Sequence, residues 1–173
     1  MIHSEALELI RPAVTGQTWA DLGAGSGIFT RALAELIGEG GTVYAVDKDV
    51  GGLRQDFAGA RVEVIRADFR HIELPPLDGI LLANALHYVR TQQAFLQKLW
   101  QYLHPGGRLA VLEYENRRPS PWVPFPIHFA ALADLLQGAG YGEVEMIATR
   151  ASRFGGEMYL MLARRGRELR AES

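Results

Sequence analysis

Hydrophobic and polar positions alternate along this chain in a way that predicts a series of β-α units. Short apolar runs predict strands over 18–22, 42–46, 61–65, 79–83 and 108–112. The run 79–83 is apolar throughout, as expected for a strand of a parallel sheet that is covered on both faces. Apolar residues at i, i+4 spacing predict a helix over 28–37 that buries one face against the sheet.

Less regular segments complete this pattern. A leading helix ends before Pro12, and a short helix is predicted over 50–57 with Asp49 as its cap. Thr91 is the predicted cap of a further helix with apolar residues at helical spacing. The turn-forming segment 104–107 ends this helix and precedes the fifth strand.

The last third of the chain has a different organisation. Four prolines make 115–126 a loop, which a helix over 127–139 follows. Two strands are predicted over 142–148 and 157–163. The link between them is too short for a helical crossover, so these strands are expected to pair antiparallel. A charged tail, 165–173, is expected to fray.

Composition narrows the class of protein. The 173 residues fit a single domain, 1–173, in which 1–16 forms a short N-terminal helix or cap. The net charge of −2 gives no global field for nucleic acid or an anionic membrane. There are no cysteines, which excludes disulfides, thiolate nucleophiles and zinc-thiolate sites. No apolar run approaches the roughly 18–20 residues that cross a bilayer, and the N-terminus is too acidic for a secretory signal. The expected location is the cytoplasm.

A glycine turn followed by a distant acid is the most informative chemical feature. Gly23, Gly25 and Gly27 come directly after the first strand, and Asp47 ends the second. This arrangement suits a nucleoside-bearing cofactor, because glycine lets the backbone approach a ligand and the acid accepts hydrogen bonds from a ribose. The dinucleotide pattern G-x-G-x-x-G is not met, since Ile28 stands where its third glycine belongs. Asp21, ahead of the turn, suits a ligand ammonium better than a pyrophosphate.

Five segments in order over 20–112 carry a family resemblance. They read DLGAGSG from Asp21, VYAVD ending at Asp47, RADF ending at Phe69, DGILLANALH ending at His87, and LHPGGRL from Leu103. This series resembles the motifs of the class I S-adenosylmethionine-dependent methyltransferases, of the small-molecule type. The resemblance implies an α/β fold with a doubly wound, mostly parallel seven-stranded sheet. Its expected strand order is 3-2-1-4-5-7-6, with the last strand antiparallel and helices on both faces.

The resemblance also implies which residues bind S-adenosylmethionine and release S-adenosylhomocysteine. Asp47 is expected to hold the ribose hydroxyls, Asp68 the adenine amino group, and Phe69 the adenine ring. The start of the first long helix suits the cofactor carboxylate, and Asp21 its ammonium. Phe69 has core packing as an equal alternative. The full predicted set is Asp21, Gly23, Ala24, Gly25, Ser26, Gly27, Asp47, Lys48, Asp68, Phe69, Asn84 and Ala85.

Candidates for acid–base chemistry lie where strands four and five end. His87 is the first candidate for a general base or a substrate contact, followed by Glu113 and Tyr114, and His128 is a further one. A base is needed only if the acceptor begins protonated. No His or acid cluster has convincing metal spacing, so no metal is expected.

The loop 115–126 is expected to face the acceptor. Trp122 and Phe125 would form an apolar wall, and Arg117 and Arg118 would meet an acidic group. The alternative is a rigid loop that only covers strand five.

The fourth-strand motif fits small-molecule enzymes of the type that includes quinone-precursor methylation. It lacks the Pro-Pro-aromatic sequence of amine-methylating enzymes of DNA, and nucleic acid is therefore a disfavoured partner. Fewer than twenty residues precede strand one, so the site is expected to be open, or closed by a second subunit of a homodimer. Two alternatives stay open: an NAD(P)-dependent Rossmann oxidoreductase and a non-catalytic S-adenosylmethionine-binding partner protein.

Overall fold

A computed structural model describes residues 1–166. Its seven strands form one sheet in the order β3-β2-β1-β4-β5-β7-β6, which is the predicted order. The strands are β1 (Thr18–Leu22), β2 (Thr42–Asp47), β3 (Arg61–Arg66), β4 (Leu77–Ala83), β5 (Leu103–Tyr114), β6 (Tyr141–Ala151) and β7 (Glu157–Arg165). The first five are parallel, and β7 pairs antiparallel with both β5 and β6, as predicted.

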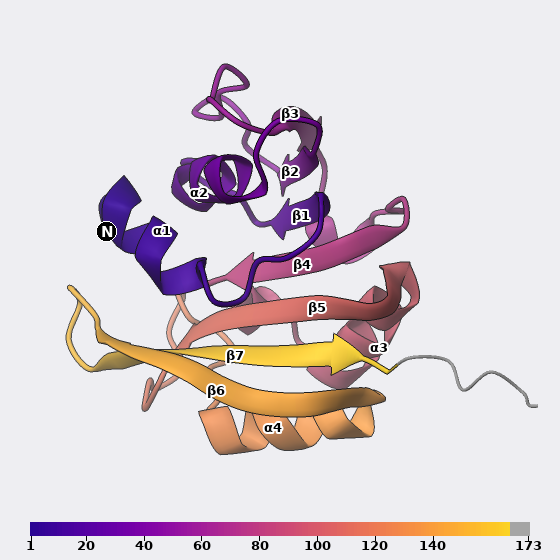
Figure 1. Cartoon of the computed structure of the whole chain (residues 1–173). Helices are drawn as coiled ribbons and strands as arrows, with labels where there is room; N and C mark the ends of the chain where they lie inside the picture. Colours follow the sequence, from indigo (N-terminus) through magenta and orange to yellow (C-terminus); the bar gives the residue numbers. More distant parts are fainter. Residues whose placement is uncertain (167–173) are drawn as a thin grey trace, which may run out of the picture.

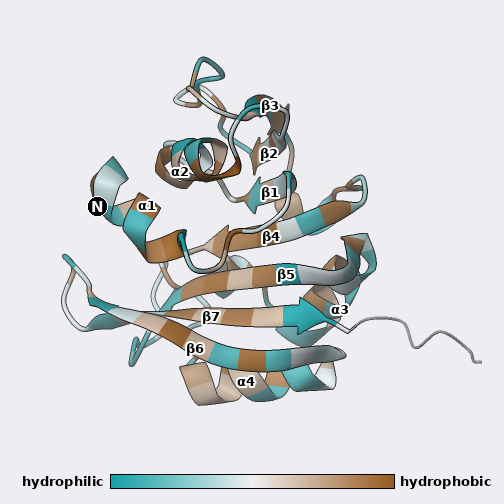
Figure 2. Cartoon of the chain, viewed as in Figure 1, coloured by the Kyte–Doolittle hydropathy of each residue, from teal (hydrophilic) through white to brown (hydrophobic). Residues whose placement is uncertain are grey.

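Helices cover both faces of the sheet, as the pattern of apolar positions predicts (Figure 1). Helix α2 (Ile28–Ile37) packs over β1 to β3 on one face, and α1 (His3–Ile10) packs against α2. Helices α3 (Gln92–Tyr102) and α4 (Phe129–Gly138) pack together on the other face, beside β5 to β7. Each face has its own apolar core, and Figure 2 shows the hydrophobic colouring along β4 and β5.

Tight packing against the sheet explains why position 79 holds a glycine. A Cβ placed on Gly79 of β4 would lie 2.1 Å from the indole ring of Trp19, which is fully buried. The edge strand β6 mixes exposed and partly buried residues, and its colouring in Figure 2 is correspondingly mixed. A bulge between Gly142 and Glu145 interrupts its pairing with β7, a common device at sheet edges.

Four local predictions differ from the structure. The segment 50–57 is a series of turns and bends and not a helix, because Gly51 and Gly52 disfavour helix formation. Asp49 therefore caps a turn: its carboxylate accepts from the N–H of Gly51 at 3.1 Å. Thr91 stands at the N-cap of α3, but its side chain makes no capping hydrogen bond.

The third difference is at the start of β5. The segment His104–Gly107 lies within this strand, which begins at Leu103, and not in a break before it. Leu77 of β4 pairs with Leu103 and Gly79 with Arg108, so these four residues form an irregular bulge between two paired positions. The helix predicted over 127–139 is also shorter, since His128 has an extended backbone. Of the predicted tail 165–173, Arg165 is the last residue of β7, and 167–173 lie outside the described residues.

The parallel strands bring their carboxyl ends to one edge of the sheet. In Figure 1 the arrows of β1 and β4 point left and that of β7 points right. The glycine turn after β1 and the segments after β2, β4 and β5 therefore lie at the same edge, where ligands of doubly wound sheets bind.

Candidate active site

The glycine turn is held in place by β2 and leaves open space in front of it. Gly23, Gly25 and Gly27 all have positive φ angles, which glycine adopts without steric cost. The N–H groups of Gly23 and Ala24 donate to the carbonyl of Val46 at 2.8 and 3.0 Å. A Cβ placed on Gly25 would meet no atom within 4 Å. The turn thus presents bare backbone to a cavity.

Asp47 closes this turn from the end of β2. One carboxylate oxygen accepts from the N–H of Gly25 at 2.8 Å, and the other accepts from the N–H of Asp49 at 3.0 Å. A carboxylate oxygen accepts more than one hydrogen bond, so both oxygens keep capacity for a ligand hydroxyl. The acid is therefore oriented in advance at the rim of the cavity.

The glycine-turn cavity, as we call it, has a volume of about 720 Å³. Eight of its lining residues belong to the predicted cofactor set: Gly23, Gly25, Asp47, Lys48, Asp68, Phe69, Asn84 and Ala85. Four others were missed: Arg70, Tyr88, Pro124 and Phe125. Asp21, Ala24, Ser26 and Gly27 do not line it. Phe125 lines this cavity and not the acceptor wall that the sequence predicts for it.

Asp68 is more constrained than the sequence indicates. Its carboxylate accepts from the backbone N–H of Arg70 at 3.0 Å and from the guanidinium of Arg70 at 2.7 Å, and Lys48 Nζ lies 3.3 Å away. The guanidinium of Arg70 holds the pKa of Asp68 well below its usual range. The contact between Arg70 and Asp68 could have been predicted from their spacing. Arg70 follows by two residues an acid that caps a short 3₁₀ turn, Phe69–His71.

Phe69 and Asp21 lie on the two sides of the turn. The Phe69 ring lines the cavity and also packs at 5.8 Å, tilted, on Phe95 of the core. Asp21 is 1% exposed and turns toward α2, where Thr30 Oγ1 donates to it at 2.7 Å. Its second oxygen has no partner among the described residues, and burial raises its pKa to about 6. An ammonium near this oxygen would stabilise its charged form.

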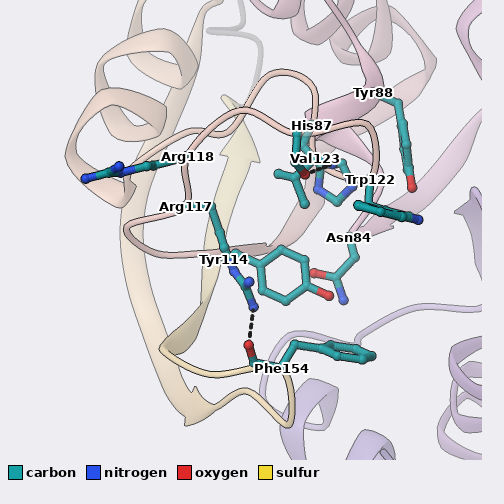
Figure 3. A pocket seen from close by; sticks show the side chains of 10 residues that line it. Asn84, His87, Tyr88, Tyr114, Arg117, Arg118, Trp122, Val123 and Phe154 are labelled. Atoms are coloured by element: carbon teal, nitrogen blue, oxygen red, sulfur yellow. Dashed lines mark hydrogen bonds between the residues drawn. The ribbon is translucent and has the colours of Figure 1, made fainter.

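A second cavity, the loop cavity, adjoins the first. Its volume is about 640 Å³, and Figure 3 shows the side chains around it. Asn84 and Tyr88 line both cavities, so the two spaces meet there. Asn84 has a φ of 53°, unusual for a residue with a side chain, and its buried Oδ1 has no partner among the described residues. Strained and unpaired polar groups of this kind gather at functional sites.

A buried histidine–glutamate pair faces the loop cavity. His87 is 2% and Glu113 1% exposed. One oxygen of Glu113 lies 2.8 Å from His87 Nδ1, and the other accepts from the backbone N–H of His87 at 3.0 Å. A carboxylate at this distance favours the tautomer of the neutral ring that carries its proton on Nδ1, in which Nε2 is a hydrogen-bond acceptor. Nε2 is buried and has no partner among the described residues. This arrangement is the one that a general base requires.

With this geometry established, comparison with known proteins identifies the family. A profile described as a methyltransferase domain matches residues 20–111, which is more than half of the chain. This chain belongs to that methyltransferase family.

Relatives of this methyltransferase domain include a curated enzyme named ubiquinone/menaquinone biosynthesis C-methyltransferase UbiE, from Escherichia coli K12. The two are 32% identical over 110 residues, which cover 58% of this chain and 44% of that enzyme. The chain thus spans less than half the length of the curated relatives that it matches.

Solved structures share the fold of the methyltransferase domain. One is the 1,6-didemethyltoxoflavin-N1-methyltransferase of Burkholderia thailandensis, solved with 1,6-didemethyltoxoflavin and S-adenosylhomocysteine. It is 21% identical with a TM-score of 0.73, covering 95% of this chain and 78% of that one. Another is human N-acetylserotonin methyltransferase in complex with SAM, 22% identical with a TM-score of 0.70, covering 94% and 52%.

The remaining predicted residues of the methyltransferase domain lie in several places. Tyr114 lines the loop cavity, and burial raises the pKa of its hydroxyl. Ser26 lines a third cavity of about 520 Å³, where Asn84 and Tyr114 are also found. His128 lines neither of the first two cavities; its Nδ1 pairs with Glu115 at 2.6 Å.

The loop 115–126 is the wall of the loop cavity on one side. Its Arg117, Arg118, Ser120, Trp122 and Val123 all line this space. Among the described residues, no group of three His, Cys, Asp or Glu is placed to hold a metal ion. No helix within 1–166 is long and apolar enough to span a membrane.

Proposed function

We propose that this chain is an S-adenosylmethionine-dependent methyltransferase that moves a methyl group to a small or medium organic acceptor. The observation that carries the proposal is the buried His87–Glu113 pair, which faces a cavity that joins the glycine-turn cavity at Asn84. One cavity suits the methyl donor and the other the acceptor. An oriented base lies beside their junction.

The residues of the glycine-turn cavity fit the donor. The open space before Gly25 admits a ligand against bare backbone, and Asp47 offers two oriented oxygens to ribose hydroxyls. Phe69 supplies an aromatic face for adenine. Asn84 lines this cavity, and its unpaired Oδ1 suits the ammonium of the methionine part. When bound, S-adenosylmethionine supplies an electrophilic methyl group on a sulfonium.

The protein's part in the chemistry is to position the acceptor and take its proton. His87 Nε2 accepts the proton of an acceptor hydroxyl, and the Glu113 carboxylate stabilises the imidazolium that forms. Tyr114 stays a neutral hydrogen-bond donor because burial raises its pKa. The aromatic residues Tyr88 and Trp122 line this space.

An acceptor related to quinone precursors is the most specific class that we propose here. The curated relative's name places it in ubiquinone and menaquinone biosynthesis, and the fourth-strand motif of this chain predicts an enzyme of that type. A hydroxyl activated by His87 supports methylation either on that oxygen or on a carbon conjugated with it.

Cofactor binding is tested by titrating the protein with S-adenosylhomocysteine and, separately, with NAD⁺ and NADP⁺. We expect only the first to bind. The substitution Asp47→Ala should weaken it at least about tenfold, since two charged acceptors are lost. Asp49→Ala is the matched control: this exposed acid is two residues away and does not line the cavity. Binding of the dinucleotides alone would favour the oxidoreductase alternative, for which the comparisons give no support.

Three further features of the proposal rest on the sequence. We place the chain in the cytoplasm, with nucleic acid disfavoured as a partner, and we expect a second subunit to cover the open side of the site. Trp122 and Phe154, at the loop cavity, are 77% and 67% exposed, and such a subunit would bury them. Sedimentation analysis would reveal the dimer; a monomer at high protein concentration would contradict it.

A further inference from the structure

Arg117 stands out among the side chains of the loop cavity because its charge has no anionic partner. Its Nη2 donates to the backbone carbonyls of Phe154 and Gly155 at 3.3 and 3.0 Å, the first of which Figure 3 draws as a dashed line. Its guanidinium lies 4.6 Å above the centre of the Tyr114 ring. No described acid forms an ion pair with it, and its Nε and Nη1 donate to no described residue.

None of the described acids nearest the loop cavity forms an ion pair with this guanidinium. No Asp or Glu lines the cavity. Glu113 lies behind His87, and both carboxylate oxygens of Glu113 are engaged by hydrogen bonds with His87. Glu115 and Glu157 line a smaller neighbouring cavity of about 310 Å³ that Arg117 also touches, and Glu115 is held there by His128. The loop cavity therefore carries net positive charge on a half-buried residue. Partial burial strengthens the electrostatic attraction of such a residue for a bound anion.

The neighbouring Arg118 does not share this arrangement. It is exposed, and Figure 3 shows its guanidinium directed away from the aromatic side chains of the cavity. Arg117 lies among them, beside Tyr114 and Phe154. Of the two arginines predicted to meet an acidic group, only Arg117 is placed to do so.

The remaining lining residues indicate the shape of the anion. Tyr88, Tyr114, Trp122 and Phe154 provide four aromatic rings around one space, which favours a planar aromatic ligand. The His87 and Tyr114 rings are 6.0 Å apart, and the Arg117 guanidinium is 4.6 Å from the Tyr114 ring. The base and the cation are thus separated by no more than the sum of these distances, which one aromatic ring with two substituents bridges.

We propose that Arg117 binds a carboxylate of the acceptor, so that the substrate class is the hydroxyaryl carboxylic acids. This inference rests on the proposed function. The acceptor's hydroxyl faces His87 Nε2, its ring lies among the aromatic side chains, and its carboxylate accepts from Nη1 of Arg117, because Nη2 already donates to the Phe154 and Gly155 carbonyls. A guanidinium attracts a carboxylate by its charge and donates charge-assisted hydrogen bonds to it.

The test is calorimetric titration of the protein, with and without saturating S-adenosylhomocysteine, at pH 7.5. The probes are hydroxybenzoic and hydroxycinnamic acids, each paired with its primary amide. We expect at least one acid to bind about tenfold or more tightly than its amide. Acids no better than amides, including the case in which neither binds, would overturn the proposal.

Two variants locate the effect. Arg117→Gln keeps a donor for the Phe154 and Gly155 carbonyls and removes the charge; it should abolish the preference for acids. Arg118→Gln removes an equal charge next to it and should leave the preference intact. A preference that persists in Arg117→Gln would also overturn the proposal. If this variant does not fold, the comparison of acid with amide in the unaltered protein still decides.

The outcomes separate this proposal from the proposed function. If S-adenosylhomocysteine does not bind but acids bind through Arg117, the methyltransferase proposal fails and the anion site stands. If S-adenosylhomocysteine binds and acids are not preferred, the anion-site proposal fails and the methyltransferase proposal stands.

Discussion

The substitution Glu113→Gln is expected to abolish most of the activity while leaving the shape of the site almost unchanged. In the protein, both oxygens of Glu113 accept hydrogen bonds, one from the backbone N–H of His87 at 3.0 Å and one from its ring at Nδ1, 2.8 Å away. A glutamine has one acceptor and one NH₂ donor in their place. It cannot serve both.

Either arrangement of the glutamine has a cost. If its oxygen keeps the backbone N–H, its NH₂ meets Nδ1, and the ring proton moves to Nε2, which can no longer take a proton. If its oxygen meets the ring, the buried backbone N–H is left unpaired, at about 1–3 kcal/mol of stability. We expect the first arrangement. It should lower the rate of methyl transfer by about 10²–10⁴-fold, which is the usual contribution of a general base.

The assay is the initial rate of labelled methyl transfer to whichever hydroxyaryl acid is turned over. S-adenosylhomocysteine affinity is measured beside it and should not change. The chain provides a close control in Glu115→Gln. Glu115 also binds a histidine Nδ1, that of His128 at 2.6 Å, and a backbone N–H, that of Phe129 at 3.0 Å, yet it does not line the loop cavity. A folded Glu113→Gln protein with a rate within about twofold of the unaltered protein would refute the reasoning.

Three further predictions concern the turn and the core. Gly25→Ala should weaken the binding of S-adenosylhomocysteine at least about tenfold, because it places a methyl group in the open cavity. Gly106 also has a positive φ and open space around it, so Gly106→Ala should lower stability without changing this affinity. Equal affinity for S-adenosylhomocysteine in both variants would contradict this prediction. Burial raises the pKa of Asp21 from 3.8 to about 6, so its contribution to stability is complete below pH 3.8 and is lost as the pH rises through about 6. The unfolding free energy of the protein relative to Asp21→Asn should fall over that range, and a flat difference would show that the carboxyl is not perturbed. Gly79→Ala should destabilise the fold by about 1–3 kcal/mol in chemical denaturation because its Cβ would overlap the ring of Trp19, and an unchanged midpoint would contradict this packing.

The regular elements were predictable because each depends on its own sequence. The apolar strands and the stripe of α2 gave their positions to within a few residues, and the short link before β7 dictated an antiparallel end of the sheet. The helix predicted over 50–57 does not form, because Gly51 and Gly52 disfavour a helix. The early start of β5 was not predictable, since it depends on Leu103 pairing with Leu77 across the sheet.

The candidate site was predictable residue by residue but not as a set of contacts. The motifs named His87 and Glu113 separately, as alternatives. Their pairing follows from the adjacency of β4 and β5, whose carboxyl ends bring residues 26 positions apart into contact. The salt bridge of Asp68 with Arg70 and the difference between Arg117 and Arg118 depend on side-chain directions that sequence spacing does not determine.

The most direct test of the methyltransferase proposal is a single-turnover reaction with methyl-labelled S-adenosylmethionine and the hydroxyaryl acids, supplemented by a metabolite extract. We expect label to appear in a low-mass organic product, with one S-adenosylhomocysteine formed for each methyl group transferred. Transfer should fall to background in a His87→Gln protein that still binds S-adenosylhomocysteine. Tight cofactor binding without any transfer by the unaltered protein would contradict the proposal and identify a non-catalytic binding protein.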